Sequence, residues 1–308
     1  MTSVLLFFWI LSALLIVLER KAVRLIVYLG VFSLISSGCF LLFAAPDVAM
    51  AEAVVSVFST ILFIVAFERY YSIADSAPET KALSFLSVLK AHVLPLGFTL
   101  LLLLLFIRFI PSGTINNVLK NQYLTNFQAD IGGENAVTAV YLGYRMYDTL
   151  FEALMLLVSI VTLVHLSWHA KVSVPHGEPS HIRDSEIAKI PIRLICPVLV
   201  LFSVYLVMNG HISPGGGFQG GVVVASLFVC RYMIHDIYDI RIDRVLTLEK
   251  LVFLFVVLLA VLFIVLGANA YWGIPKEFYL VLMNLLIGIK VACGFLIIFY
   301  RFIVLERR

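Results

Sequence analysis

The stretch from Pro46 to Phe67, PDVAMAEAVVSVFSTILFIVAF, places two carboxylates at the start of a run that carries no further charge. A bilayer core of about 30 Å needs about 20 predominantly apolar residues in helical form. This composition therefore predicts a membrane-spanning helix. Asp47 and Glu52 then lie at or below the membrane surface, where a carboxylate is costly and calls for an explanation.

The rest of the 308-residue chain has the same character. Sixty-two per cent of the residues are hydrophobic and 13% are charged, about half the charged share of a soluble domain. The mean hydropathy is +1.05. A cytosolic enzyme, a secreted domain or a disordered chain would need far more polar surface, so all three classes are excluded. The net charge of +3 is too small to suggest nucleic-acid binding.

Eight further apolar runs are predicted to cross the membrane in addition to Val48–Phe67. They are Thr2–Leu18, Ala22–Ala45, Val93–Ile110, Thr149–Leu166, Ile192–Met208, Gly221–Ile234, Val252–Leu266 and Phe278–Ile303. With the N-terminus outside, the loops on the cytoplasmic side receive 17 basic residues and the outer loops receive 4, as the positive-inside rule requires. The sequence thus predicts an all-α, multi-pass protein of the cell membrane with about nine helices, N-terminus out and C-terminus in.

Cysteine and histidine spacing gives no sign of a metal or redox centre. Each of the four cysteines lies in an apolar run, and no CxxC pair is present. Three histidines fall in the polar linker Trp168–Lys189, where a solvated loop explains them better than a metal site does. We expect no catalytic residue, cofactor or metal site in this chain.

The two carboxylates of the opening stretch have different interpretations. Asp47 follows Pro46 at the helix start, where it could cap free backbone N–H groups. Glu52 is a turn deeper among apolar residues, and a cap does not explain it. An ion path or a contact with a neighbouring protein of a complex would.

A second charged group opens the predicted helix at Thr149. Arg145, Asp148 and Glu152 can meet on one helical face at 100° per residue. Asp148 could be a cap, and Arg145 could serve as a counter-ion for either carboxylate. A structural ion pair and a place on an ion path are both open.

Lys290 lies near the middle of the last predicted helix, between Gly288 and Gly294, which allow close helix approach. Snorkelling to the interface is difficult from that depth. A buried lysine can release its proton and so carry protons. It could also pair with a neighbouring protein of a complex.

The segment from Asn209 to Gly221 is rich in glycine. It formally contains GxGxxG, but no strand precedes it and it lies between two membrane helices, so a dinucleotide site is excluded. We expect a tight re-entrant turn packed in protein or lining a wet cavity. His211 in this turn could change charge near neutral pH or serve as a structural polar residue. The predicted turn residues are Pro214, Gly215, Gly216, Gly217, Phe218, Gly220 and Gly221.

The predicted topology brings these groups to one side of the membrane. Glu52, Asp148, Glu152 and His211 all fall in its outer half, with Lys290 near the midplane. We hypothesise that they border a hydrated outer route for a cation or a proton.

Three of these stretches together resemble a known family. Pro46–Ala53 is similar to the PDVAxxEA signature in the C-terminal part of MrpA, the large component of Mrp-type sodium/proton antiporters. Asn135–Thr138 and Tyr144–Glu152 are similar to the adjacent NxVT…FRGxDTxGE motif, with Tyr, Met and Phe at its Phe and two Gly positions. Ser213–Gly221 is similar to the PGGGFQGG signature of the MrpB component, the most specific of the three.

The resemblance implies a division of the chain and a function. Residues 1–90 would be a three-helix segment like the end of MrpA, residues 91–185 a two-helix segment with the second motif, and residues 186–308 a four-helix domain like MrpB. It implies membership of a multisubunit antiporter module that moves Na⁺ and H⁺, with other Mrp-like proteins and complex I-like membrane and redox proteins as partners. The implied host is a respiratory complex of the membrane-bound hydrogenase or sulfur-reductase type. A free-standing Mrp antiporter and a non-conducting structural role are the alternatives.

Overall fold

The structure is a computed structural model that describes residues 2–19, 21–71, 85–109, 117–169, 186–234, 241–265 and 273–304. Over these ranges the chain is helical and contains no strand. The long helices are α1 (Thr2–Leu18), α2 (Ala22–Leu42), α3 (Pro46–Tyr71), α4 (Phe85–Phe109), α7 (Met146–His169), α8 (Glu186–Asn209), α9 (Gly217–Ile234), α10 (Ile242–Ala260) and α12 (Lys276–Val304).

Six helices in the described ranges are long and apolar enough to cross a membrane: α2, α3, α7, α8, α12, and α10 together with the π-helical η3 (Val261–Val265). Three shorter apolar helices, Thr2–Leu18, Leu96–Phe109 and Gly217–Arg231, fall in α1, α4 and α9. The prediction of an all-α, multi-pass membrane protein is confirmed.

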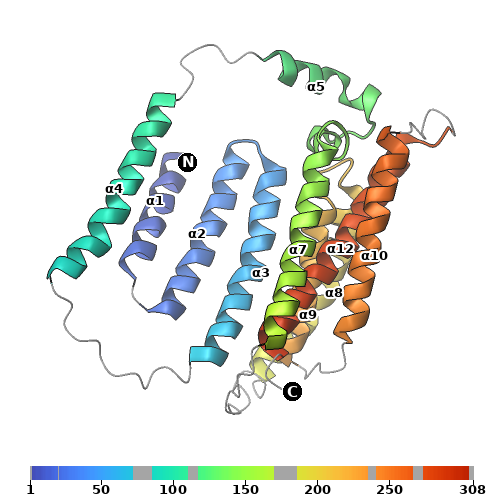
Figure 1. Ribbon diagram of the computed structural model, residues 1–308. Helices are drawn as coiled ribbons and strands as arrows, with labels where there is room; N and C mark the ends of the chain where they lie inside the picture. The colour runs from blue at the N-terminus through green and yellow to red at the C-terminus, as the bar shows by residue number, and fades with distance from the viewer. Residues whose placement is uncertain are drawn as a thin grey trace.

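The helices alternate in direction, and the starts of α3, α7, α9 and α12 share one end of the molecule, here called the motif end (Figure 1). α5 (Val118–Asp130) lies across this end. It is tied to the start of α12 by Lys276, whose Nζ donates to the carbonyl of Ala129 at 2.5 Å. Short α6 (Ala136–Ala139) and the π-helical turn η2 (Val140–Tyr144) lead from α5 into α7. That the motif end faces outward stays a prediction.

The core lies where α7, α10 and α9 pack around α12. Buried side chains of this core include Leu142, Val222, Val256, Leu280 and Met283. α3 joins it through Phe58, whose ring meets that of Phe295 edge-on at 4.9 Å. Because α9 carries glycines on the side facing α12, the two backbones come close, as small residues permit in membrane helices.

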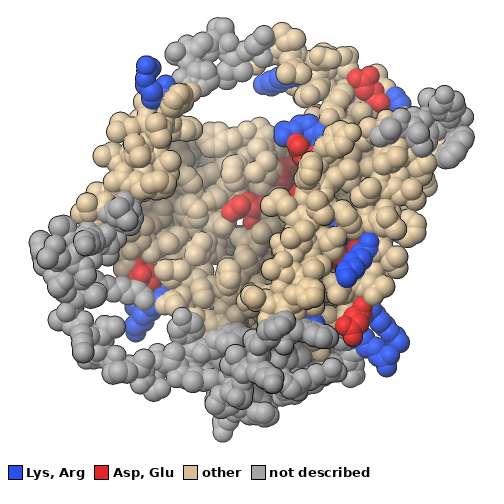
Figure 2. All heavy atoms as spheres, in the orientation of Figure 1, with Lys and Arg blue, Asp and Glu red and all other residues tan. Residues whose placement is uncertain are grey.

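The first three helices extend the bundle as a row, α1 on α2 and α2 on α3 (Figure 1). Polar contacts fix this row: Trp9 Nε1 donates to Ser36 Oγ at 2.7 Å, and Ser37 Oγ donates to the carbonyl of Ala49 at 2.7 Å. The described side chains of α4 are all exposed. Figure 2 shows the visible face as mostly uncharged, with an acidic group near its middle. Such a surface is suited to lipid or to other membrane helices.

Candidate functional site

Three segments that are distant in the sequence meet at the motif end around the side chain of Asn135. Its Oδ1 accepts hydrogen bonds from two backbone N–H groups and so caps the start of α6. Its Nδ2 lies 3.1 Å from Asp47 Oδ1, 3.1 Å from the carbonyl of Ser213 and 3.3 Å from that of Gly210. One amide thus joins the start of α3 and the glycine-rich segment to α6.

Asp47 acts between segments, whereas the sequence favoured a cap on its own helix. α3 begins at Pro46, so Asp47 already lies in the first turn. Its Oδ1 accepts from Asn135 Nδ2 and from the backbone N–H of Gly215, the latter at 3.2 Å. The side chain is buried, and these two donors compensate the removal of the carboxylate from water.

A second set of hydrogen bonds adjoins the first at the carbonyl of Gly210. Thr138 Oγ1 donates to the carbonyl of Gly210 at 2.6 Å. Tyr141 Oη and the backbone N–H of Gly217 both donate to Asn284 Oδ1, at 3.2 and 3.1 Å. We call Asp47, Asn135, Thr138, Tyr141, Asn284 and the backbone of residues 210–217 the polar junction.

Tyr141 remains a hydrogen-bond donor at physiological pH. It precedes the membrane-spanning part of α7. Burial, reinforced by the negative charges of Asp47 and Glu152, raises the pKa of its hydroxyl to about 12. The hydroxyl therefore stays protonated and keeps its bond to Asn284.

The glycine-rich turn is shorter than the sequence suggested. Gly215 and Gly216 adopt φ values of 150° and 146°, which L side chains rarely take, and α9 begins directly after them at Gly217. Phe218, Gly220 and Gly221 are therefore helical, which corrects the prediction of a turn that reaches Gly221. Close packing is the reason, because glycines in the first turns of α9 let it approach α12.

Two glycines on one face of α9 make this approach possible. A Cβ at Gly217 would collide with the carbonyl oxygen of Asn284, and a Cβ at Gly221 would lie 2.6 Å from the carbonyl oxygen of Gly288. Both obstacles are backbone atoms of α12, which no side-chain rotation can move. Gly217 and Gly221 of the glycine-rich motif therefore serve mainly to let α9 pack closely against the backbone of α12, and less to make the turn flexible.

Glu52 lies five residues along α3 from Asp47, about 7.5 Å deeper at 1.5 Å per residue. Its side chain is half-buried. No hydrogen bond connects it to the junction within the described part of the chain. That Glu52 lies on an ion path, or contacts a neighbouring protein of a complex, stays a prediction.

Of the three charged residues around the start of α7, two form an ion pair and the third lies apart. Arg145 forms an ion pair with Asp148, and both side chains are largely exposed in this chain. Exposed pairs of this kind contribute little to stability. Glu152, one turn further along, is also exposed on α7 and lies near enough to Tyr141 for its charge to act there.

His211 joins the junction through its backbone. Its carbonyl accepts from the N–H groups of Glu134 at 2.9 Å and Asn135 at 3.0 Å. Its Nδ1 is buried and lacks a hydrogen-bond partner among the residues described.

Lys290 pairs with a residue that the sequence patterns did not single out. Its Nζ donates to Glu249 Oε1 at 2.5 Å, and both side chains are 0% exposed. Glu249 belongs to the buried stripe of α10, with Val252, Val256 and Ala260. This three-and-four spacing is visible in the sequence and would have placed Glu249 on the core side. Its position beside Lys250, near the predicted membrane edge, hid it.

Asn284 was also missed. It is an amide within the apolar stretch of α12 and is fully buried. A polar residue in such a run is a signal for an internal hydrogen bond, because lipid offers none.

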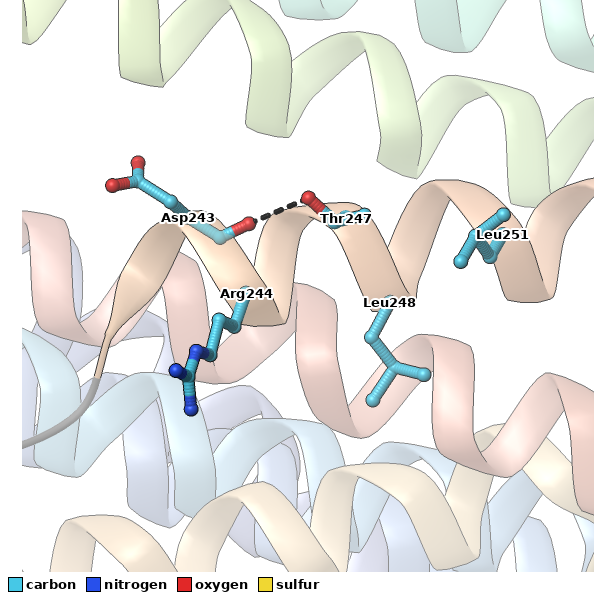
Figure 3. A pocket seen from close by; sticks show the side chains of 5 residues that line it. All are labelled: Asp243, Arg244, Thr247, Leu248 and Leu251. Carbon is cyan, nitrogen blue, oxygen red and sulfur yellow. Dashed lines mark hydrogen bonds between the residues drawn. The ribbon is translucent and has the colours of Figure 1, made fainter.

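A shallow, open depression lies on α10, lined by Asp243, Arg244, Thr247, Leu248 and Leu251 (Figure 3). Thr247 Oγ1 donates to the carbonyl of Asp243 at 2.8 Å. Glu249 is two residues from Thr247 and therefore about 200° around the helix. The depression is thus separate from the buried pair. In the described ranges no group of three His, Cys, Asp or Glu side chains could hold a metal ion.

Two parts of the chain match known protein families. Residues 187–297 match a family described as a domain related to the MnhB subunit of Na⁺/H⁺ antiporters. Residues 7–71 match the MbhD family, a component of the MBH complex. The two matches contain the glycine-rich motif and the PDVA motif, respectively.

Among curated proteins, the chain is similar to the putative antiporter subunit mnhA2 of Staphylococcus haemolyticus, 31% identical over 153 residues. That alignment covers 49% of this chain and 18% of the relative. The protein of the same name from Staphylococcus aureus strain MRSA252 is 31% identical over 142 residues, which are 46% of this chain and 17% of the relative. These alignments span less than a fifth of the curated relatives.

Two solved structures share the fold. The Mrp complex from Dietzia sp. DQ12-45-1b contains a chain that superposes with a TM-score of 0.79 at 18% identity, covering 99% of this chain and 35% of that one. The archaeal membrane-bound sulfane sulfur reductase contains one with a TM-score of 0.51 at 26% identity, covering 69% of this chain and 94% of that one. The chain thus contains a segment that matches the MbhD family and a domain related to MnhB, and it is similar to subunits of Mrp-type antiporters.

Proposed function

We propose that this chain contributes to cation and proton translocation as a membrane subunit of a multisubunit Mrp-like Na⁺/H⁺ antiporter module. The relation to antiporter subunits and the fold shared with an Mrp complex support this role. The chain would bind other Mrp-like subunits through the apolar surfaces that it leaves exposed.

The host that we propose is a respiratory complex related to complex I, of the hydrogenase or sulfur-reductase type. The likeness to a chain of the sulfane sulfur reductase and the match to the MbhD family favour it. The mnhA2 relatives favour a free-standing Mrp antiporter as the second candidate. In either host we propose the division into residues 1–90, 91–185 and 186–308.

The observation that carries the proposal is the polar junction and the carboxylate beneath it. The junction holds the three motif segments together at one end, and Glu52 lies about 7.5 Å below Asp47 on α3. A carboxylate in an apolar helix is costly unless a cation, a proton or a partner compensates its charge. With Asp148, Glu152 and His211 near the same end, Glu52 is a suitable stopping point for a cation or proton.

Replacing Glu52 by glutamine is expected to reduce sodium-dependent proton exchange at least tenfold in the assembled complex. The amide keeps the shape and hydrogen-bonding capacity of the side chain but removes the charge that a cation or proton would occupy. The measurement is the fluorescence change of a ΔpH-sensitive dye when NaCl is added to vesicles that contain the complex.

Glu277→Gln is the matched control, because Glu277 is an exposed carboxylate in the first turn of α12 at the same end. Its exchange rate should equal that of the wild type. If Glu52→Gln assembles and exchanges as fast as this control, the non-conducting structural role is favoured instead.

A further inference from the structure

The pair Glu249–Lys290 lies in the interior of the bundle, apart from the polar junction. Lys290 is six residues beyond Asn284, about 9 Å further along α12 and about 240° around it. None of the hydrogen bonds of the junction, in the described part of the chain, reaches either member of the pair. The pair joins α10, which carries Glu249, to α12, which carries Lys290.

The pair is incompletely satisfied for a purely structural salt bridge. A lysine ammonium has three donors, and Glu249 Oε1 is its hydrogen-bond acceptor among the described residues. The ring of Phe253 is also near, with its centroid 5.4 Å from Nζ. Glu249 Oε2 is buried without a partner over the same ranges.

Such an arrangement gains little as a stabilising device. Removing both charges from water costs several kcal/mol per ion, and the attraction repays this only if further hydrogen bonds satisfy the remaining groups. A well-packed apolar pair often stabilises a protein as much or more. The free Oε2, by contrast, leaves a lone pair to which a water or a proton can bind.

We propose that Glu249 and Lys290 form a proton-transfer site within the membrane domain, separate from the carboxylates of α3 and α7. A proton passes along the 2.5 Å hydrogen bond from the ammonium of Lys290 to the carboxylate of Glu249, leaving a neutral amine and a carboxylic acid. The transferred proton is then on Oε1. Rotation of the carboxyl group about its Cγ–Cδ bond exchanges the positions of the two oxygens and carries this proton to the unpartnered side, where the acid releases it. The amine then takes up the next proton. The net charge of the site then changes by one for each proton, without a redox partner.

This inference rests on the proposed antiporter function, and its test separates the two. The double variant Glu249→Gln/Lys290→Met removes both charges and keeps the side-chain volumes. Each single variant leaves a buried group unpaired and is expected to lower the yield of complex. The double variant is expected to recover yield and Tm, while proton exchange in vesicles stays at least tenfold below the wild type.

Lys290→Arg is the second variant, because a guanidinium keeps the ion pair but does not lose its proton in proteins. It should assemble and lose exchange. Wild-type exchange in an assembled double variant or in an assembled Lys290→Arg variant would overturn the proposal. Absence of exchange in the wild-type complex would instead refute the antiporter function.

If neither variant assembles, infrared difference spectra of the wild-type complex at two pH values test whether Glu249 gains and loses a proton. A buried carboxylic acid that gains or loses its proton changes the carbonyl stretch, and we expect that change. Its absence from the wild-type spectra would overturn the proposal.

Discussion

Replacing Gly217 by alanine is expected to reduce the yield of assembled complex at least tenfold. The new Cβ would collide with the backbone carbonyl oxygen of Asn284. Overpacking costs about 1–3 kcal/mol where side chains can adjust, and a helix backbone adjusts less. The shift of α9 away from α12 would also break the bond between the Gly217 N–H and Asn284 Oδ1.

The yield of solubilised complex after size-exclusion chromatography, together with its Tm, measures this effect. Gly97→Ala is the matched control, because a Cβ built at Gly97 in α4 meets no atom within 4 Å among the described residues outside its own turn of helix. Its helical alanine should leave Tm unchanged or slightly raised. Equal yields for the two variants would show that the α9–α12 contact tolerates a methyl group.

Replacing Asn135 by aspartate should be at least as damaging. The change keeps an oxygen for the cap of α6 but removes the donor to three acceptors. It also places a second carboxylate against Asp47. In the wild type, Asn135 Nδ2 lies 3.1 Å from Asp47 Oδ1, and the variant puts an oxygen in place of that nitrogen. Each polar group left without a partner costs about 1–3 kcal/mol, and like charges in a buried site add to this. We expect almost no assembled complex.

The exchanged pair Asp47→Asn/Asn135→Asp tests the contact itself. It restores one amide facing one carboxylate, so assembly should recover in part. Recovery should be incomplete, because the bonds to the carbonyls of Gly210 and Ser213 are not restored. Asn121→Asp on exposed α5 is the control and should assemble like the wild type. If the exchanged pair is no better than Asn135→Asp alone, the contact between residues 47 and 135 is not what assembly depends on.

Hydropathy predicted helix positions well where a run was bounded by polar residues. α1 has the predicted limits, Thr2–Leu18, since Arg20 and Lys21 follow it. α9 begins four residues before the predicted Gly221. Glycine lowers apparent hydropathy and favours turns in isolation, yet here it is the residue that lets a helix form against a neighbour.

The sequence by itself determined that the chain is a membrane protein, that successive helices alternate in direction, and which motifs carry charge into the membrane. These properties follow from local composition, because each apolar run must satisfy its own backbone hydrogen bonds in lipid. Only the tertiary structure decided how the charged and polar groups pair. Asp47 bonds to Asn135, 88 residues away, and Lys290 bonds to Glu249, 41 residues away on a different helix. Such partners depend on helix packing and rotation, which a one-dimensional pattern of hydropathy does not specify.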